Sequence, residues 1–217
     1  LVGSEMCIRD SRNTEPSSTL RINEISNKLL DEGKNVYKFG LGQSPFPVPE
    51  ILIEALKKNA HQKDYLNVSG LLKLREVVAK YHSKKNLHNY SEDNVIIGPG
   101  SKELIFQCQM VTEMPLLLPK PSWVSYEPQA KILKKDVNWI DTSKNTNWHL
   151  SANVLKDYCK NNKYKNQLLI LNSPNNPTGT NNEELEELSK ICKENNIIII
   201  SDEIYTELDF NGNYHSI

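Results

Sequence analysis

Hydrophobic residues from about residue 90 onward alternate between two patterns. Short apolar runs, typical of strands, are followed by segments in which apolar residues recur every three or four positions, as on one face of a helix. The expected strands are 94–97, 116–118, 137–140, 168–171 and 197–200, and the expected helices are 102–111, 126–133, 154–159 and 185–192. Continuous Leu and Ile runs are what a parallel sheet covered on both faces requires. The pattern therefore predicts a three-layer α/β/α fold with a mostly parallel sheet.

Two elements near the end of the chain carry further expectations. The four isoleucines at 197–200 indicate a strand that is apolar on both faces. Thr180 and Glu183 have the spacing of a capping box for the helix that contains Leu185.

The first 45 residues lack this alternation. A helix is expected over 21–30, with Gly33 as its C-terminal stop, and a short strand is expected at 36–39. The proline-rich segment 45–49 must run irregularly, because each proline removes a backbone donor and restricts the residue before it. This part of the chain resembles an arm more than a layered domain.

Helical spacing returns over 51–56 and 71–81, ahead of the alternating region. We therefore expect an N-terminal arm or small-domain segment at 13–45 and a large domain at 46–217. Residues 1–12 differ from both, with an internal methionine and no apolar stretch of signal-peptide type. We expect them to be a non-native leader.

Composition and charge exclude several classes of protein. The 217 residues are 38% hydrophobic and 24% charged, which is typical of a globular domain with a real core. A formal net charge of −1 gives no electrostatic footprint for nucleic acid or for an anionic membrane surface. The longest apolar runs are too short to span a bilayer. We expect neither nucleic acid nor a membrane as a partner.

Four cysteines are scattered along the chain without a CxxC pair, at positions 7, 108, 159 and 192. No histidine stands near them at ligand spacing, so neither a zinc site nor a disulfide scaffold is expected. Cys108, Cys159 and Cys192 fall on the apolar stripes of expected helices. We expect them to be small buried residues of a cytoplasmic protein.

Residues directly after the strands are the place to look for chemistry, because ligands of open α/β sheets bind outside the carboxyl ends of the strands. After 94–97 comes Gly98-Pro99-Gly100-Ser101-Lys102, leading into a helix. Glycines let a backbone approach a ligand, and a helix start offers free N–H groups to a phosphate. Ser101 can also cap the helix, and an ordinary turn and cap is the alternative reading.

The next two strand ends carry an aromatic and an amide-rich loop. Trp123 lies in a proline-braced loop after 116–118, where it can stack on a flat ring or plug the core. The loop 172–179 reads Asn-Ser-Pro-Asn-Asn-Pro-Thr-Gly, whose amides supply neutral donors and acceptors. A plain multiple turn remains the alternative for this loop.

The last strand end carries a carboxylate. Asp202 follows 197–200 directly and precedes Glu203-Ile204-Tyr205. A carboxylate placed after a buried strand is costly unless a cation or hydrogen-bond donors meet it. A surface aspartate that ends the strand is the alternative.

Taken together, these four segments resemble the class I/II aminotransferases of pyridoxal-phosphate (PLP) fold type I, over about 35–217. The most specific matches are 123–126, 172–179 and 201–205. The resemblance implies the fold type I large domain, here truncated, and pyridoxal 5′-phosphate as the cofactor. It also implies amino-group transfer between an L-amino acid and a 2-oxo acid, in amino-acid biosynthesis.

The resemblance assigns roles to single residues around the cofactor ring. Asp202 would pair with the pyridine nitrogen and favour the protonated ring, which then acts as an electron sink. Asn176 and Tyr205 would hydrogen-bond the phenolic oxygen, and Asp202 and Tyr205 are the expected catalytic residues. Trp123 would stack on the ring, and both Trp123 and Asn176 would also face the substrate.

Four further roles lie at the phosphate and at the substrate carboxylate. Ser101 and Lys102 would bind the phosphate, mainly through backbone N–H groups. Gly42 matches the glycine whose backbone meets the substrate carboxylate. Tyr65 resembles the tyrosine that reaches the phosphate of a neighbouring subunit, which implies a homodimer.

The residues that the family needs for covalent chemistry come after Tyr205 in family order. They are the Schiff-base lysine, an arginine at the phosphate and an arginine for the substrate carboxylate. No lysine or arginine stands between Tyr205 and Ile217. We expect that the chain is truncated, that the activity belongs to a longer parent, and that the chain alone is inactive.

Three alternatives to transamination differ in what they require of the sequence. A C–S lyase or a decarboxylase of the same fold would keep much of the same cofactor site. A non-catalytic PLP-binding regulator would carry a basic recognition helix, which the sequence before Asn35 lacks. A dinucleotide-binding domain would need a third glycine after Gly98 and Gly100, where Lys102 and Glu103 stand instead.

Overall fold

The computed structural model describes residues 18–40, 42, 44–86, 88–210, 212 and 215–217. These fall into two compact units. The helical unit contains residues 18–79 and 91–97, and the sheet unit contains residues 80–90 and 98–217. The expected leader at 1–12 lies outside the described residues.

The sheet unit is built on parallel strands, ordered β2-β1-β3-β4. The strands are β1 (Leu116–Lys120), β2 (Val137–Asp141), β3 (Gln167–Asn172) and β4 (Ile197–Asp202). The helices of this unit are α5 (Ser101–Met110), α6 (Tyr126–Ile132), α7 (Ala152–Asn161) and α8 (Leu185–Glu194), with short 3-10 turns η2 (Lys144–Thr146) and η3 (Thr206–Leu208). Every strand is thus followed by a helical element, as the sequence pattern predicts.

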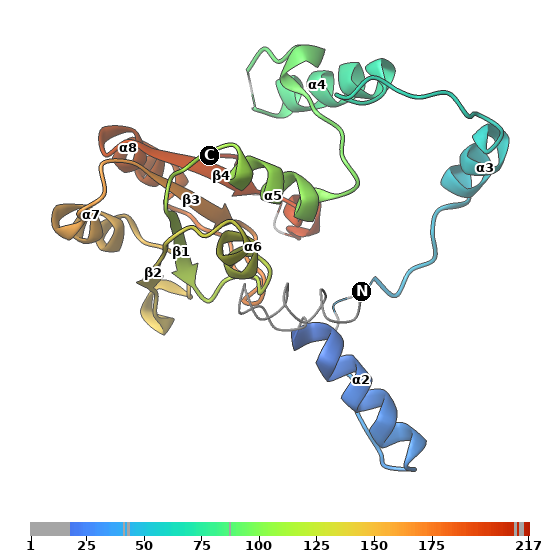
Figure 1. Ribbon diagram of the computed structural model, residues 1–217, viewed down its shortest axis with the longest axis horizontal. Coiled ribbons are helices and arrows are strands. Elements are labelled where there is room, and N and C mark those ends of the chain that lie inside the picture. Colours follow the sequence, from blue (N-terminus) through green and yellow to red (C-terminus); the bar gives the residue numbers. More distant parts are fainter. Residues whose placement is uncertain (1–17, 41, 43, 87, 211, 213–214) are drawn as a thin grey trace, which may run out of the picture. The chain divides into compact units, whose positions relative to one another are not determined.

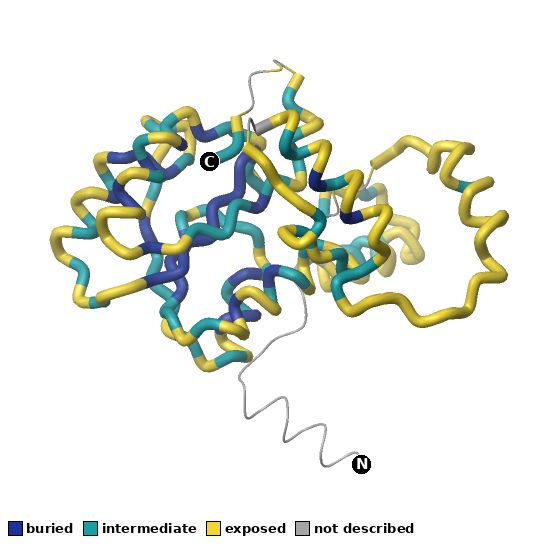
Figure 2. The backbone as a smooth tube through the Cα atoms, turned by 90° about the horizontal axis from the view of Figure 1, so that it is seen from above, coloured by how far each residue is buried: buried dark blue, intermediate teal, exposed yellow. Residues whose placement is uncertain are grey.

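Two cores cover the two faces of the sheet. Neighbouring residues of a strand point to opposite faces, so Leu116 and Leu117 enter different cores. One core joins the sheet to α7 and α8, and the other joins it to α5 and α6, as the placement of the helices in Figure 1 shows. β3 is buried along its whole length, in dark blue in Figure 2. The predicted three-layer α/β/α fold is confirmed, and its sheet is parallel throughout the described strands.

The helical unit has little interior of its own. Its elements are α2 (Ser18–Asp31), α3 (Glu50–Asn59), the 3-10 turn η1 (Glu92–Asn94) and the first part of α4 (Leu72–Asn86), which continues into the sheet unit. Gly33 ends α2 in the left-handed conformation, with φ of 77°, and its N–H donates to the carbonyl of Leu30. The predicted stop is therefore confirmed. α3 buries none of its residues.

Two expected strands are absent from the described structure. Residues 36–39 form no strand, and at 94–97 η1 gives way to unpaired extended chain. Neither segment has a neighbouring strand to pair with. The N–H of Ile97 instead donates to the carbonyl of Ser69 at 2.9 Å, and its side chain packs against Gly70, where a Cβ would come within 2.6 Å of it. An apolar run favours a strand only when a ladder partner is at hand.

Other local expectations are also wrong. α8 begins at Leu185 with Glu184 at its N-cap, so Thr180 and Glu183 stand too early to form the capping box. Ile198 is 51% exposed, because β4 is the edge strand of the described sheet and is not covered on both faces.

The cysteines differ in burial. Cys108 is exposed, since the buried stripe of α5 runs through Ile105 and Gln109 instead. Cys159 is half-buried and Cys192 is buried. The expectation of three buried cysteines therefore holds fully only for Cys192.

Candidate active site

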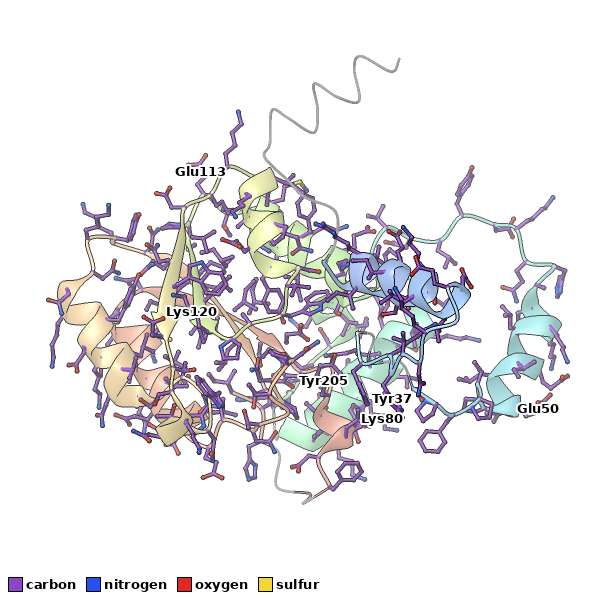
Figure 3. The ribbon with its side chains drawn as sticks, turned by 90° about the horizontal axis from the view of Figure 1, so that it is seen from below. Tyr37, Glu50, Lys80, Glu113, Lys120 and Tyr205 are labelled. Carbon is purple, nitrogen blue, oxygen red and sulfur yellow. The ribbon has the colours of Figure 1, made fainter. Side chains whose placement is uncertain are left out.

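The candidate site lies at the carboxyl edge of the sheet. Because the strands are parallel, β1, β3 and β4 all end there, at Lys120, Asn172 and Asp202. Figure 3 labels Glu113, which precedes β1, and Lys120, which ends it, so that the direction of the strand can be followed. Asn172 and Asp202 are register partners, so their backbones lie side by side.

Asp202 is buried, with 7% of its surface exposed, and its carboxylate is held at both oxygens. Tyr126 donates its hydroxyl to Oδ2 at 2.6 Å, and the N–H of Ile204 donates to Oδ1 at 3.3 Å. A buried carboxylate needs such donors in place of water. Asp202 is the last residue of β4 and lies inside the fold, so the surface alternative is wrong.

Asn172 connects the ends of β3 and β4 to the following loop. Its side-chain amide donates to the carbonyl of Asp202 at 2.8 Å, and its Oδ1 accepts from the N–H of Asn176 at 2.7 Å. Asn176 in turn donates from Nδ2 to the hydroxyl of Tyr205 at 3.2 Å. The loop is therefore more than a plain turn, because its side chains bond the backbone of Asp202 and the hydroxyl of Tyr205.

Trp123 forms the aromatic part of the site. It is half-buried and packs against the core shared by α5 and α6. Its ring meets the ring of Tyr126 edge to face, with centroids 5.3 Å apart and an angle of 78°. The Nζ of Lys102 lies over the same indole, 5.2 Å from its centroid. Trp123 thus packs partly into the core, and the rest of its indole is accessible to a flat ligand.

The start of α5 forms the polar end of the site. Gly100 is the N-cap, with φ of 109°, so Ser101 is the first helical residue and does not cap the helix as expected. No side chain caps α5, which leaves its first N–H groups available to an anion. Gln129 donates to the carbonyl of Lys102 at 2.8 Å, which ties this helix start to α6.

The structure brings most of the expected site residues together. A continuous set of contacts runs from the α5 start to the end of β4 through Lys102, Trp123, Tyr126, Asp202, Asn172, Asn176 and Tyr205. Gly42 and Tyr65 belong to the helical unit, where both are exposed, so their roles stay predictions.

Two residues of the site were missed at the level of sequence. The sequence predicts Tyr126 as the start of a helix and as the end of the specific 123–126 segment, and Asn172 only as the start of a loop, with no site role for either. The position of Tyr126 at the start of a helix, next to Trp123 in a strand-end loop, was a usable signal. Nothing in the pattern reveals that Asn172 is the register partner of Asp202.

The donor set fits a flat, anionic, nitrogen-containing ring. A buried carboxylate suits a protonated ring nitrogen, an amide with a phenol suits a ring oxygen, an indole suits the ring plane, and an uncapped helix start suits a phosphate. No cluster of metal-ligating side chains occurs within the described ranges. Among the helices described, none has both the length and the apolar character that crossing a bilayer demands.

Solved structures with the same fold are aminotransferases. The aspartate aminotransferase from Thermus thermophilus with maleate matches with a TM-score of 0.86 and 26% identity, over 96% of this chain and 56% of that one. The alanine aminotransferase from Pyrococcus furiosus matches with a TM-score of 0.80 at 23% identity, over 93% of this chain and 53% of that one, and supports the fold alone. The fold is that of PLP fold type I enzymes.

Sequence comparison defines the family. The model of the family "Aminotransferase class I and II" matches residues 30–216, and the chain belongs to this PLP-dependent family. An aspartate aminotransferase of Bacillus sp. (strain YM-2) is 32% identical over 207 residues, covering 92% of this chain and 52% of that protein. An asparagine–oxo-acid transaminase of Streptococcus mutans is 30% identical over 206 residues, with 91% and 52% covered. The chain thus spans about half the length of the curated relatives it matches.

Proposed function

We propose that this chain forms the cofactor-binding half of a PLP-dependent aminotransferase, which moves an amino group between an L-amino acid and a 2-oxo acid. The observation that carries the proposal is the buried carboxylate of Asp202, held by Tyr126 beside the hydrogen-bonded pair of Asn176 and Tyr205. When bound, pyridoxal 5′-phosphate supplies the electron sink for this chemistry.

The side chains of this unit have distinct tasks in the proposal. Asp202 holds a proton at the ring nitrogen, because a buried anion favours the charged partner. Asn176 and Tyr205 donate to the ring oxygen. Trp123 fixes the plane of the ring, and the start of α5 with Ser101 binds the phosphate through backbone N–H groups.

Lys102 is proposed to act near the phosphate as a mobile positive charge. Its side chain is exposed, and its Nζ lies 5.2 Å from the centroid of the Trp123 indole. An ammonium on a flexible stem can turn from the indole to a neighbouring anion at little cost. The role of Lys102 is therefore subsidiary to that of the backbone.

The substrate and partner assignments extend the proposal to the helical unit. Gly42 would meet the substrate carboxylate, with Trp123 and Asn176 facing the substrate, and Tyr65 would reach the phosphate site of a second copy. Exposed apolar residues of α3 support a homodimer, since surface of this kind is usually covered by a partner. They are Ile51, Leu52 and Leu56.

We further propose that the enzyme is cytoplasmic and biosynthetic. The free thiols of Cys108, Cys159 and Cys192 support a reducing, cytoplasmic location.

The Schiff-base lysine is proposed to lie in the part of its relatives' length that this chain does not span, since the chain covers 52% of the aspartate aminotransferase of Bacillus sp. (strain YM-2). The test compares the 217-residue chain with a protein that carries it at the full length of its relatives. Each is given pyridoxal 5′-phosphate, an L-amino acid and a 2-oxo acid, and the new amino acid is measured. We expect turnover only in the longer protein. Turnover by the 217-residue chain would overturn the lysine assignment, and ammonia without a new amino acid would indicate elimination in place of transfer.

A further inference from the structure

Tyr126 contacts two of the groups assigned to the cofactor. Its hydroxyl donates to Oδ2 of Asp202 at 2.6 Å, and its ring meets Trp123 at 5.3 Å between centroids. These two partners come from the ends of different strands, β4 and β1. Tyr126 itself is the first residue of α6 and is only 1% exposed.

The direction of the hydrogen bond is fixed by the surroundings of the phenol. Burial raises the pKa of Tyr126 well above its ordinary range, and the negative charge of Asp202 raises it further. The phenol therefore keeps its proton and acts as a permanent donor. The Asp202 carboxylate acts as the acceptor of this hydrogen bond.

The second oxygen of Asp202 has a weaker restraint. The N–H of Ile204 reaches Oδ1 at 3.3 Å, and this amide belongs to the chain just after Asp202 itself. The hydroxyl of Tyr126 is the shorter contact and comes from a different element, 76 residues away in sequence. Without it, the carboxylate can rotate about its side-chain bonds while keeping the local amide contact.

We propose that Tyr126 is a positioning residue, which holds the Asp202 carboxylate in the orientation that pairs with the ring nitrogen of the cofactor. The inference rests on the proposed function, because it concerns the same site. Through the edge-to-face contact of its ring, Tyr126 also fixes the position of the Trp123 indole relative to that carboxylate. One side chain thereby couples the contact at the ring edge to the contact at the ring face.

The test uses pyridoxamine 5′-phosphate, which needs no lysine to bind, with an isotope label at its ring nitrogen. Tyr126→Phe is compared with the wild-type chain and with Tyr158→Phe. Tyr158 is a matched control, because its hydroxyl is also partly buried and hydrogen-bonded, to Gln167 at 3.1 Å. The dissociation constant and the chemical shift of the labelled nitrogen are measured near neutral pH, with circular dichroism as the check on folding.

The proposal predicts that Tyr126→Phe weakens binding about tenfold and moves the nitrogen signal towards the unprotonated form, as expected for losing one hydrogen bond to a charged group. Tyr158→Phe should match the wild type in both measurements. In an Asp202→Asn background, Tyr126→Phe should add no further loss, because its effect passes through the carboxylate.

The outcomes separate this inference from the proposed function. A wild-type chain that does not bind pyridoxamine 5′-phosphate overturns the proposed function and this inference with it. Binding by the wild type with unchanged affinity and nitrogen shift in Tyr126→Phe overturns the inference alone. An unfolded Tyr126→Phe chain beside a folded Tyr158→Phe chain would assign the hydroxyl to the stability of the fold and would also overturn it.

Discussion

Asn172 offers a direct test of how the site is built, because its side chain joins three segments of chain. Its amide bonds the carbonyl of Asp202, and its Oδ1 accepts from Asn176, at 2.8 and 2.7 Å. Asn172→Ala removes both contacts. A net hydrogen bond contributes about 0.5–1.5 kcal/mol, so the two together contribute about 1–3 kcal/mol. The backbone N–H of Ser173 still donates to the carbonyl of Asp202 at 3.3 Å in the variant, so this carbonyl keeps one partner. We therefore expect a loss of unfolding free energy near the middle of that range, about 2 kcal/mol.

The assay is urea unfolding followed by tryptophan fluorescence, which gives the free energy of unfolding of each variant. Asn145→Ala is the matched control, because Asn145 is exposed in η2, and we expect a change within about 0.5 kcal/mol there. Asn172→Ala should also weaken binding of pyridoxamine 5′-phosphate, since Asn176 loses its anchor. A loss no larger than that of the control would refute the reasoning that Asn172 braces the site.

Two further predictions concern the cores. Leu169 is fully buried in β3, so Leu169→Ala should lower the free energy of unfolding by about 2–5 kcal/mol. Ile198 is half-exposed on the edge strand, so Ile198→Ala should lower it by about 1 kcal/mol or less. Urea unfolding measures both, and equal losses would contradict the assigned cores. Burial raises the pKa of Cys192 to about 12, so its contribution to stability is full below the pKa of an unfolded thiol and is lost as the pH rises from about 9 towards 12. Alkylation followed by mass spectrometry should accordingly label the exposed Cys108 well before Cys192, and equal rates would count against this burial.

The layered part of the fold was predictable because local and long-range preferences agree there. The Leu and Ile runs at 116–118 and 168–171 have strands beside them, so the pattern and the outcome match. The segments at 36–39 and 94–97 are also mainly β-branched or aromatic, although each includes one polar residue, but they have no neighbouring strand and form none. Strand formation depends on the partner, which the sequence of a single segment does not contain.

The site was predictable as a set of strand-end loops but not as a hydrogen-bond network. Asp202, Asn176 and Tyr205 stand in recognisable segments, and the parallel sheet brings them to one edge. The bonds made by Tyr126 and Asn172 depend on the register of β3 against β4 and on the seating of α6. Those are properties of packing between elements, and no spacing along the chain encodes them.

The most direct test of the account is the binding of pyridoxamine 5′-phosphate to the 217-residue chain, measured by equilibrium dialysis for wild type, Asp202→Asn and Asp141→Asn. The two aspartates are matched, because each is the last residue of its strand, but Asp141 is exposed and Asp202 is buried in the site. We predict one site per chain, weakened about tenfold or more by Asp202→Asn, as losing a charged hydrogen-bond partner implies, and unchanged by Asp141→Asn. Equal affinity in all three chains, or no binding by the wild type, would contradict the assignment of this edge of the sheet as the cofactor site.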